Sequence, residues 1–375
     1  MSKKKRIFLL ISLIIFFLLC LILFRSSFIT SVIIKAYEKN LETEEVGNIV
    51  FQYKENEQET INLLIDKVSE INNLGDEWFG GSNNSTLTVF LPKADSILEK
   101  MLGKSNAIFL QNKNIAIINS KLTENEILHA LTHEYAHFHM MTNMIELQME
   151  VTDIPEWFHE GVAEAFAHRF APVPFNQSIN QWNVIPFSEM KIRRGHDYSS
   201  IGEWYIMSQF TVERLIKDYG EGVILNLIHS TMETESFSLG FFETTGEPLE
   251  TYHKILNPDN EFINQVMHQA QEKDNLINLK QSLLDYDNVN GPYYYQADFV
   301  YHILESIYVE EQDWEKALSI LKKRMYYNHS SWMWSSASEY ALKLNDKEKA
   351  FYFAERAKEI SEQGDSHFDK IFNSE

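Results

Sequence analysis

The chain has 375 residues, of which 54 are acidic and 33 are basic, and its formal net charge is −21. This strongly acidic balance argues against a nucleic-acid partner, whose phosphates would repel it, and against tight docking on anionic lipid. The single cysteine, Cys20, excludes a disulfide framework within the chain. The length allows two or three domains, each with its own hydrophobic core.

The N-terminal segment predicts a location for the protein. An apolar run at residues 7–24 follows the basic residues 3–6. At about 1.5 Å of rise per residue, a helix of this length nearly crosses a hydrocarbon core of about 30 Å. No small-residue cleavage site ends the run, so we interpret it as an uncleaved transmembrane anchor rather than as a signal peptide. The basic cluster predicts a cytoplasmic N-terminus and an extracytoplasmic remainder, in a single-pass protein of the cell membrane.

The segments after the anchor mix helices and strands. Residues 1–25 are predicted as a basic stub with the anchor, and residues 26–58 as a juxtamembrane stalk. The apolar spacing of residues 58–75 predicts a helix that ends at Gly75. Residues 84–93 predict a strand and residues 95–103 a short helix. Residues 108–120 predict a β-hairpin that turns at residues 112–114.

Three longer helices follow. Thr123 and Glu126 form a capping-box signature, which predicts a helix from about residue 124 to 143. In the segment DIPEWFHEGVAEAFAHRF, residues 153–170, Asp153 and Pro155 predict a second helix start. A third helix is predicted to end at Gly220, and further helical segments extend to about residue 285.

The C-terminal tail contains an internal echo. Residues 313–323 align with residues 346–356 at an offset of 33, and Ala317 matches Ala350. The spacing resembles that of tetratricopeptide helix pairs, which recruit protein partners. The alternative interpretation is an ordinary helical bundle with a chance echo.

The segment HEYAH, residues 133–137, carries the clearest chemical signal. His133 and His137 are one helical turn apart, so both imidazoles can reach one ion, and Glu134 beside them can accept a proton. This is the H-E-x-x-H pattern of zinc hydrolases. The alternative is a helix whose histidines are solvated or satisfied by neighbouring side chains.

Two neighbouring histidines do not complete this site. His129 lies about 12 Å of helical rise from His137, too far for both to bind one ion. His139 is two residues beyond His137 and points to the other side of the helix. The metzincin extension of the motif is absent, because Met140 and Asn143 occupy its glycine and histidine positions. A third ligand must therefore come from another segment.

The next helix offers acidic residues on one stripe. Glu156, Glu160, Glu164 and His168 recur every four residues, whereas most of the apolar residues lie elsewhere. We interpret Glu156 and His168 as part of a solvated face. For Glu160 and Glu164, a polar face turned toward the metal explains the pattern better.

HEYAH and the later W-x-x-E-G-x-A-E segment at residues 157–164 together resemble the gluzincin metallopeptidases, most closely the peptidase-MA-like branch. The resemblance covers roughly residues 85–230. It implies that Glu160 is the third zinc ligand and that Glu164 orients a ligand histidine. It also implies that Tyr205 stabilises the oxyanion, with Tyr198 and His196 as alternatives.

Two further features qualify the resemblance. The G-x-M-E-N segment by which related aminopeptidases hold a free amine is absent, which argues against aminopeptidase activity. Residues 115–120 resemble the edge strand along which gluzincins align an extended peptide.

The sequence therefore predicts an α+β fold. A mainly helical, zincin-like metallopeptidase domain with a small N-terminal β-sheet spans residues 59–285, and an all-α, tetratricopeptide-like domain spans residues 291–375. One N-terminal transmembrane helix precedes them. The predicted function is hydrolysis of a peptide or protein substrate with one Zn²⁺ ion. The alternative is a non-catalytic, membrane-tethered scaffold that recruits a protein partner through the tail.

Overall fold

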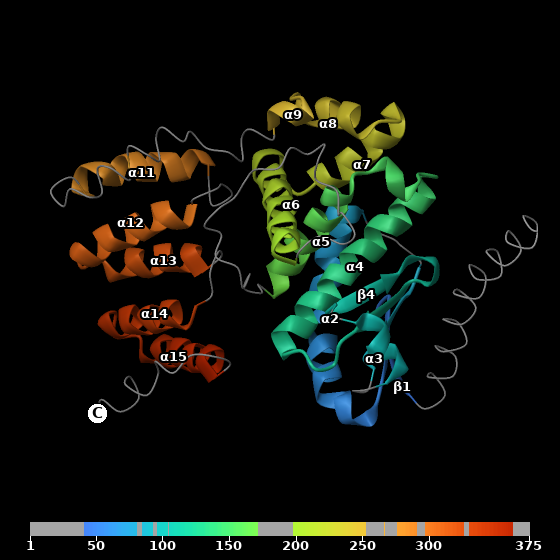
Figure 1. The fold of residues 1–375 in the computed structure, drawn as a ribbon, viewed down its shortest axis with the longest axis horizontal. Coiled ribbons are helices and arrows are strands. Elements are labelled where there is room, and N and C mark those ends of the chain that lie inside the picture. Colours follow the sequence, from blue (N-terminus) through green and yellow to red (C-terminus); the bar gives the residue numbers. More distant parts are fainter. Residues whose placement is uncertain are drawn as a thin grey trace, which may run out of the picture. The chain divides into compact units, whose positions relative to one another are not determined.

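A computed structural model of the chain describes residues 41–80, 85–92, 96–103, 105–171, 198–252, 266, 276–290, 297–325 and 330–362. These residues are mostly helical, with one β-sheet near the N-terminus (Figure 1). Backbone contacts divide the chain into two compact units. The first comprises residues 1–74 and 82–138, and the second comprises residues 75–81 and 139–375.

The sheet of the first unit has five strands in the order β1-β2-β3-β5-β4. Its strands are β1 (Glu42–Val46), β2 (Ile49–Tyr53), β3 (Leu87–Phe90), β4 (Ala107–Leu110) and β5 (Ile115–Ile118). The predicted hairpin is confirmed as the antiparallel pair β4 and β5, joined through Asn114 in the left-handed conformation. β5 also pairs in parallel with β3, so β4 is the edge strand. The prediction that residues 115–120 form the edge is wrong.

The predicted stalk is corrected from residue 42 onward. β1 and β2 form an antiparallel hairpin, and β2 continues the sheet by pairing in parallel with β3. The residues joining the two strands are Gly47, with φ of 61°, and Asn48. A Gly-Asn pair between strands is a hairpin signal. Ile49 and Phe51 are fully buried, which explains why this segment folds onto the sheet.

Two helices lie between the strands along the chain. Helix α2 (Gln58–Phe79) joins β2 to β3, and α3 (Ile97–Leu102) packs against β5. The prediction that α2 ends at Gly75 is wrong. The helix continues for one more turn because Trp78 and Phe79 are buried, and it stops before Gly80, whose φ is 82°. Helix α4 (Glu124–Glu146) begins in the first unit and ends in the second.

The second unit is helical in its described residues. It contains α5 (Glu156–Phe170), α6 (Tyr198–Tyr219), α7 (Val223–Thr234), α8 (Phe237–Thr245) and α9 (Leu249–Tyr252). Helix α5 packs on α6, and α7 packs on α8. The predicted end of the third helix is confirmed, since α6 stops before Gly220, whose φ is 86°. Trp157 packs edge to face on Phe237 with ring centroids 5.8 Å apart, so aromatic rings join α5 to α8.

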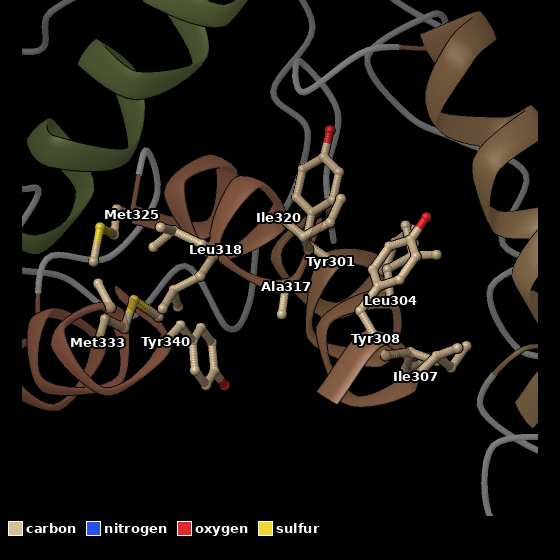
Figure 2. Packing of buried hydrophobic residues seen from close by; sticks show 14 of the residues in the cluster. Tyr301, Leu304, Ile307, Tyr308, Ala317, Leu318, Ile320, Met325, Met333 and Tyr340 are labelled. Atoms are coloured by element: carbon tan, nitrogen blue, oxygen red, sulfur yellow. The ribbon is translucent and has the colours of Figure 1, made fainter. Parts of the chain in front are cut away.

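The C-terminal helices share one hydrophobic core. They are α11 (Leu276–Asn290), α12 (Ala297–Glu310), α13 (Trp314–Met325), α14 (Ser331–Lys343) and α15 (Lys347–Glu362). Figure 2 shows part of this core, in which Leu304, Ala317 and Met333 come from three successive helices. Ile206 and Phe210 of α6 belong to the same hydrophobic cluster. The tail is therefore packed together with α6 rather than attached by a bare linker.

The repeated sequence in the tail also forms repeated hydrogen bonds. Gln312 and Asn345, 33 residues apart, both have φ of 59° and lie two residues after the end of a helix. In the next helix Lys316 N–H donates to Asp313 Oδ1 at 3.3 Å, and Lys349 N–H donates to Asp346 Oδ1 at 3.1 Å. The two helix pairs, α12–α13 and α14–α15, are thus built by the same local interactions.

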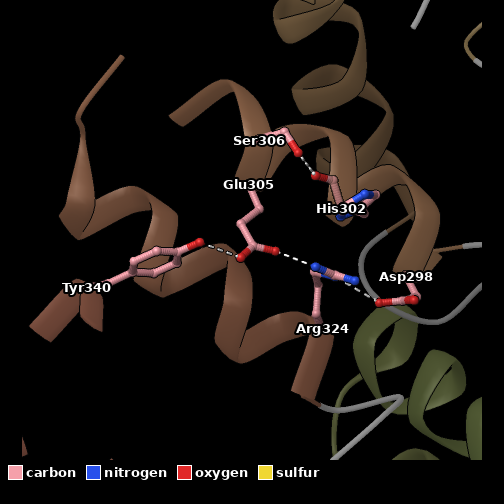
Figure 3. Close-up of polar contacts among 6 residues, drawn as sticks. All are labelled: Asp298, His302, Glu305, Ser306, Arg324 and Tyr340. Carbon is pink, nitrogen blue, oxygen red and sulfur yellow. Dashed lines mark hydrogen bonds and ion pairs between the residues drawn. The ribbon is translucent and has the colours of Figure 1, made fainter. Parts of the chain in front are cut away.

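A buried polar cluster links three of the tail helices (Figure 3). Arg324 of α13 pairs with Glu305 of α12 and donates to Asp298 Oδ1 at 3.0 Å. The Tyr340 hydroxyl of α14 donates to the other oxygen of Glu305 at 2.8 Å. Burial and the nearby Glu305 raise the pKa of Tyr340, so the hydroxyl stays protonated. Each member of this cluster is satisfied by a complementary neighbour.

The predicted membrane topology needs correction. Within the described residues, no helix has both the length and the apolar character needed to span a bilayer. The proposed span at residues 7–24 lies outside those residues. The transmembrane part of the predicted fold class, and the single-pass membrane location inferred from it, are therefore withdrawn.

Candidate metal centre

Helix α4 carries HEYAH, and its start follows the predicted capping box. The Thr123 backbone N–H donates to Glu126 Oε2 at 2.8 Å, and the Glu126 N–H donates to Thr123 Oγ1 at 3.4 Å. These bonds satisfy N–H groups that have no partner within the helix. The capping prediction is confirmed, and it places residues 133–137 in the middle of a long helix.

His133 and His137 turn their rings toward one another on this helix. Their Nε2 atoms are 3.1 Å apart, and the ring centroids are 4.8 Å apart. Two nitrogens bound at about 2.0–2.1 Å to one tetrahedral ion lie about 3.3 Å from each other. The observed separation is close to this value, so the two imidazoles are arranged as a pair of metal ligands would be.

Tyr135, the central residue of HEYAH, fixes the opposite side of the helix. Its side chain is fully buried, and its hydroxyl donates to Asn72 Oδ1 of α2 at 2.6 Å. Asn48 Nδ2 donates to the same hydroxyl at 3.4 Å. Because a residue two positions away lies about 200° around a helix, anchoring Tyr135 turns both His133 and His137 away from this contact.

Helix α5 carries the acidic residues. It begins at Glu156, directly after Pro155. The prediction that Asp153 caps this helix is wrong, because Asp153 instead forms a capping box with Glu150 around a preceding 3₁₀ turn. Glu160 and Glu164 are half-buried, whereas Glu156 is exposed.

Gly161 sets how closely α5 approaches α6. A Cβ atom at this position would lie 2.4 Å from the Ser208 carbonyl oxygen and 2.9 Å from Val212 Cγ2. Only glycine allows this contact without a shift of the backbone. The glycine between Glu160 and the rest of its motif therefore fixes the position of the helix that carries both glutamates.

Glu160 forms a group of three with the two histidines. One ligand atom from each of His133, His137 and Glu160 lies within 4.8 Å of the other two. Two imidazoles and one carboxylate form a donor set found at catalytic zinc sites. A second group, formed by His129, His133 and Glu164, meets the same limit of 4.8 Å. The described residues thus contain groups that can hold a metal ion, and His133 belongs to both.

Glu134 lies beside the first group. Its side chain is only 6% exposed. Because it directly follows His133, it leaves the helix about 100° around from that ligand. A buried carboxylate next to metal ligands has the chemistry of a proton acceptor. Its assignment as a general base stays a prediction.

His139 belongs to the protein core. It is 2% exposed, and its ring stacks on Phe79 with centroids 5.7 Å apart. Burial lowers the pKa of His139 to about 4, so the imidazole is neutral at neutral pH. It packs on the side of α4 that carries neither group.

Tyr205 lies on α6 and is half-buried. Its ring packs edge to face on Trp204, with centroids 5.1 Å apart. Of the two alternatives, Tyr198 is the first residue of α6, and His196 lies outside the described residues. The oxyanion role of Tyr205 therefore stays a prediction.

Sequence reasoning missed three residues of this region. His129 is too far from His137 to share an ion with it, but it groups with His133 and Glu164 instead. Its signal was the same four-residue spacing that identified HEYAH. Tyr135 and Gly161 act through contacts with distant segments, and neither contact can be read from local spacing.

Comparison with known proteins adds a relative but no family. No protein-family model matches the chain. The chain is 28% identical over 132 residues to "Uncharacterized protein YhcO" of Bacillus subtilis (strain 168). The match covers 33% of this chain and 38% of that protein. The name of this relative states no activity.

Proposed function

We propose that the protein is a zinc-dependent metallopeptidase of the gluzincin type that hydrolyses a peptide or protein substrate. His133, His137 and Glu160 are its metal ligands, and Glu134 is its general base. The observation that carries the proposal is the approach of three ligand atoms to within 4.8 Å of one another. The two histidines lie on α4, which also buries Glu134, and Glu160 lies on α5.

The residues divide the work of hydrolysis. His133, His137 and Glu160 would hold a divalent ion, which would supply Lewis acidity to the substrate carbonyl and to water. Glu134 accepts a proton from the attacking water and then delivers it to the leaving amine. Tyr205 donates a hydrogen bond to the developing oxyanion. Glu164 holds a ligand histidine in its binding orientation.

The proposal is tested with the full chain, by zinc content and by cleavage of a mixed peptide library. Glu134→Gln should keep its zinc and lose about 10²–10⁴-fold in cleavage rate, since it removes only the proton acceptor. Glu156→Gln is the matched control, because Glu156 is exposed one turn before Glu160. Cleavage by Glu134→Gln at the wild-type rate would contradict the proposed mechanism.

The alternative function is a non-catalytic scaffold. It is favoured by the exposed aromatic side chains of α14 and α15, since Trp332, Phe351 and Tyr352 are 46%, 60% and 49% exposed. A scaffold predicts that the wild type and Glu134→Gln are equally inactive on every peptide. The same library therefore separates the two functions.

A further inference from the structure

The two metal-binding groups are related by one helical turn. Moving back four residues along α4 replaces His137 and His133 by His133 and His129. Moving forward four residues along α5 replaces Glu160 by Glu164. Both groups contain two histidines and one glutamate, and both satisfy the same 4.8 Å limit. The two helices therefore offer the same ligand set twice.

We propose that His129, His133 and Glu164 form a second metal position, which takes a divalent transition-metal ion such as Zn²⁺ or Co²⁺. Imidazole nitrogens favour such ions over Mg²⁺ or Ca²⁺, which prefer oxygen ligands. The ring of His129 stacks beside that of His133, with centroids 6.5 Å apart. All three residues are half-buried, which leaves the position accessible to an ion from solvent.

The second position differs from the first in the residue that follows its first histidine. His133 is followed by Glu134, whereas His129 is followed by Ala130, which is buried and apolar. No carboxylate stands in the corresponding place to accept a proton from water. An ion at the second position is therefore catalytically silent.

The shared ligand couples the two positions. An ion that uses His133 at the second position withdraws an imidazole from the first. Excess metal should then inhibit, because occupancy of the silent position weakens the catalytic one. This regulatory consequence rests on the proposed function, whereas the metal position itself does not.

A different role for His129 makes a different prediction. If His129 only orients His133, its removal should weaken metal binding at the first position by about 10–100-fold. If His129 is a ligand of the second position, its removal should leave binding at the first position unchanged. Variants that disable each position separately distinguish these roles.

The test measures metal content and the visible absorption of Co²⁺ in full-length variants, with thermal unfolding as the check on folding. His137→Ala removes a ligand of the first position only and should still bind one equivalent. His129→Ala with His137→Ala should weaken that binding by at least about 100-fold, because each position then lacks a ligand. His168→Ala with His137→Ala is the matched control and should bind like His137→Ala, because His168 belongs to neither group.

Each outcome bears on one position. Failure of folded His137→Ala to bind metal would overturn the second position, as would unchanged binding in the double variant lacking His129. His129→Ala alone should bind one equivalent through the first position. Loss of all metal in that variant would show that His129 supports the first position and would overturn its assignment to a second one, whereas the proposed function is tested separately by Glu134→Gln.

Discussion

The polar cluster of the tail and the candidate metal-binding groups of α4 and α5 differ in the partners of their side chains. In the tail, the Glu305 carboxylate accepts from the Arg324 guanidinium and from the Tyr340 hydroxyl. In α4 and α5, two imidazoles and a carboxylate bring three ligand atoms together. The first arrangement is complete in the protein alone, whereas the second has the composition of a site for a cation.

Buried polar residues on helices can therefore have two different roles. A buried anion beside a guanidinium is neutralised and holds helices together. A set of histidines and glutamates at one-turn spacing gains instead from a bound ion, whose binding energy then stabilises the fold. Changes in the tail cluster should therefore alter stability without altering metal content, whereas changes to the ligand histidines of α4 should abolish metal binding.

The largest expected effect is that of His133→Ala. This variant removes the ligand common to both groups, so bound zinc should fall to background and peptide cleavage should be lost. Metal analysis of the purified full chain measures it. His229→Ala on α7 is the control, because His229 belongs to neither group. Retention of one zinc by His133→Ala would contradict both metal positions.

The next effect is on stability, in the tail. Arg324→Met should destabilise the protein by about 3–5 kcal/mol, because it leaves the buried Glu305 carboxylate without its cation. Urea unfolding measures the change. Adding Glu305→Gln to this variant should restore part of the stability, since the unpaired charge is then removed. Metal content per folded chain should equal that of the wild type in both variants. A loss of zinc would contradict the view that the tail cluster acts on stability alone.

Gly161→Ala should lower both the stability of the protein and its affinity for zinc. Its new Cβ would lie 2.4 Å from the Ser208 carbonyl oxygen, so α5 must move away from α6 at a cost of about 1–3 kcal/mol. The same shift displaces Glu160, and zinc affinity should fall. Gly222→Ala is the control, because no heavy atom lies within 4 Å of a Cβ built there. Equal stability of the two variants would show that the close approach of α5 to α6 is unimportant.

The smallest effect is expected for Tyr135→Phe. It removes the hydroxyl that donates to Asn72, which should lower the free energy of unfolding by about 1 kcal/mol. Zinc should stay bound, since the ring still fills its place in the core. Chemical denaturation with parallel metal analysis gives both quantities. A loss of zinc with no loss of stability would argue against Tyr135 as an anchor of α4.

Local signals predicted much of the secondary structure. The capping box at Thr123, the hairpin turn at Asn114 and the stop at Gly220 act within a few residues, so each is visible in the sequence. The end of α2 was misplaced because the burial of Trp78 and Phe79 outweighs the low helix propensity of Gly75. The position of β5 inside the sheet depends on pairing with a distant strand, which spacing along the chain does not encode.

The candidate site was predictable in part, for a related reason. The spacing of His133 and His137 places both imidazoles on one side of a helix whatever the rest of the fold does. That Glu160 approaches them depends on where α5 lies, which Gly161 and α6 decide. His129 was excluded with respect to His137 alone, and its grouping with Glu164 needed the arrangement in space.

The measurement that tests the central claim most directly is a crystal structure of the zinc-loaded chain with anomalous scattering at the zinc edge. The account predicts a strong peak about 2.0–2.2 Å from nitrogens of His133 and His137 and from a carboxylate oxygen of Glu160. Zinc bound elsewhere, with these three side chains unliganded, would contradict it.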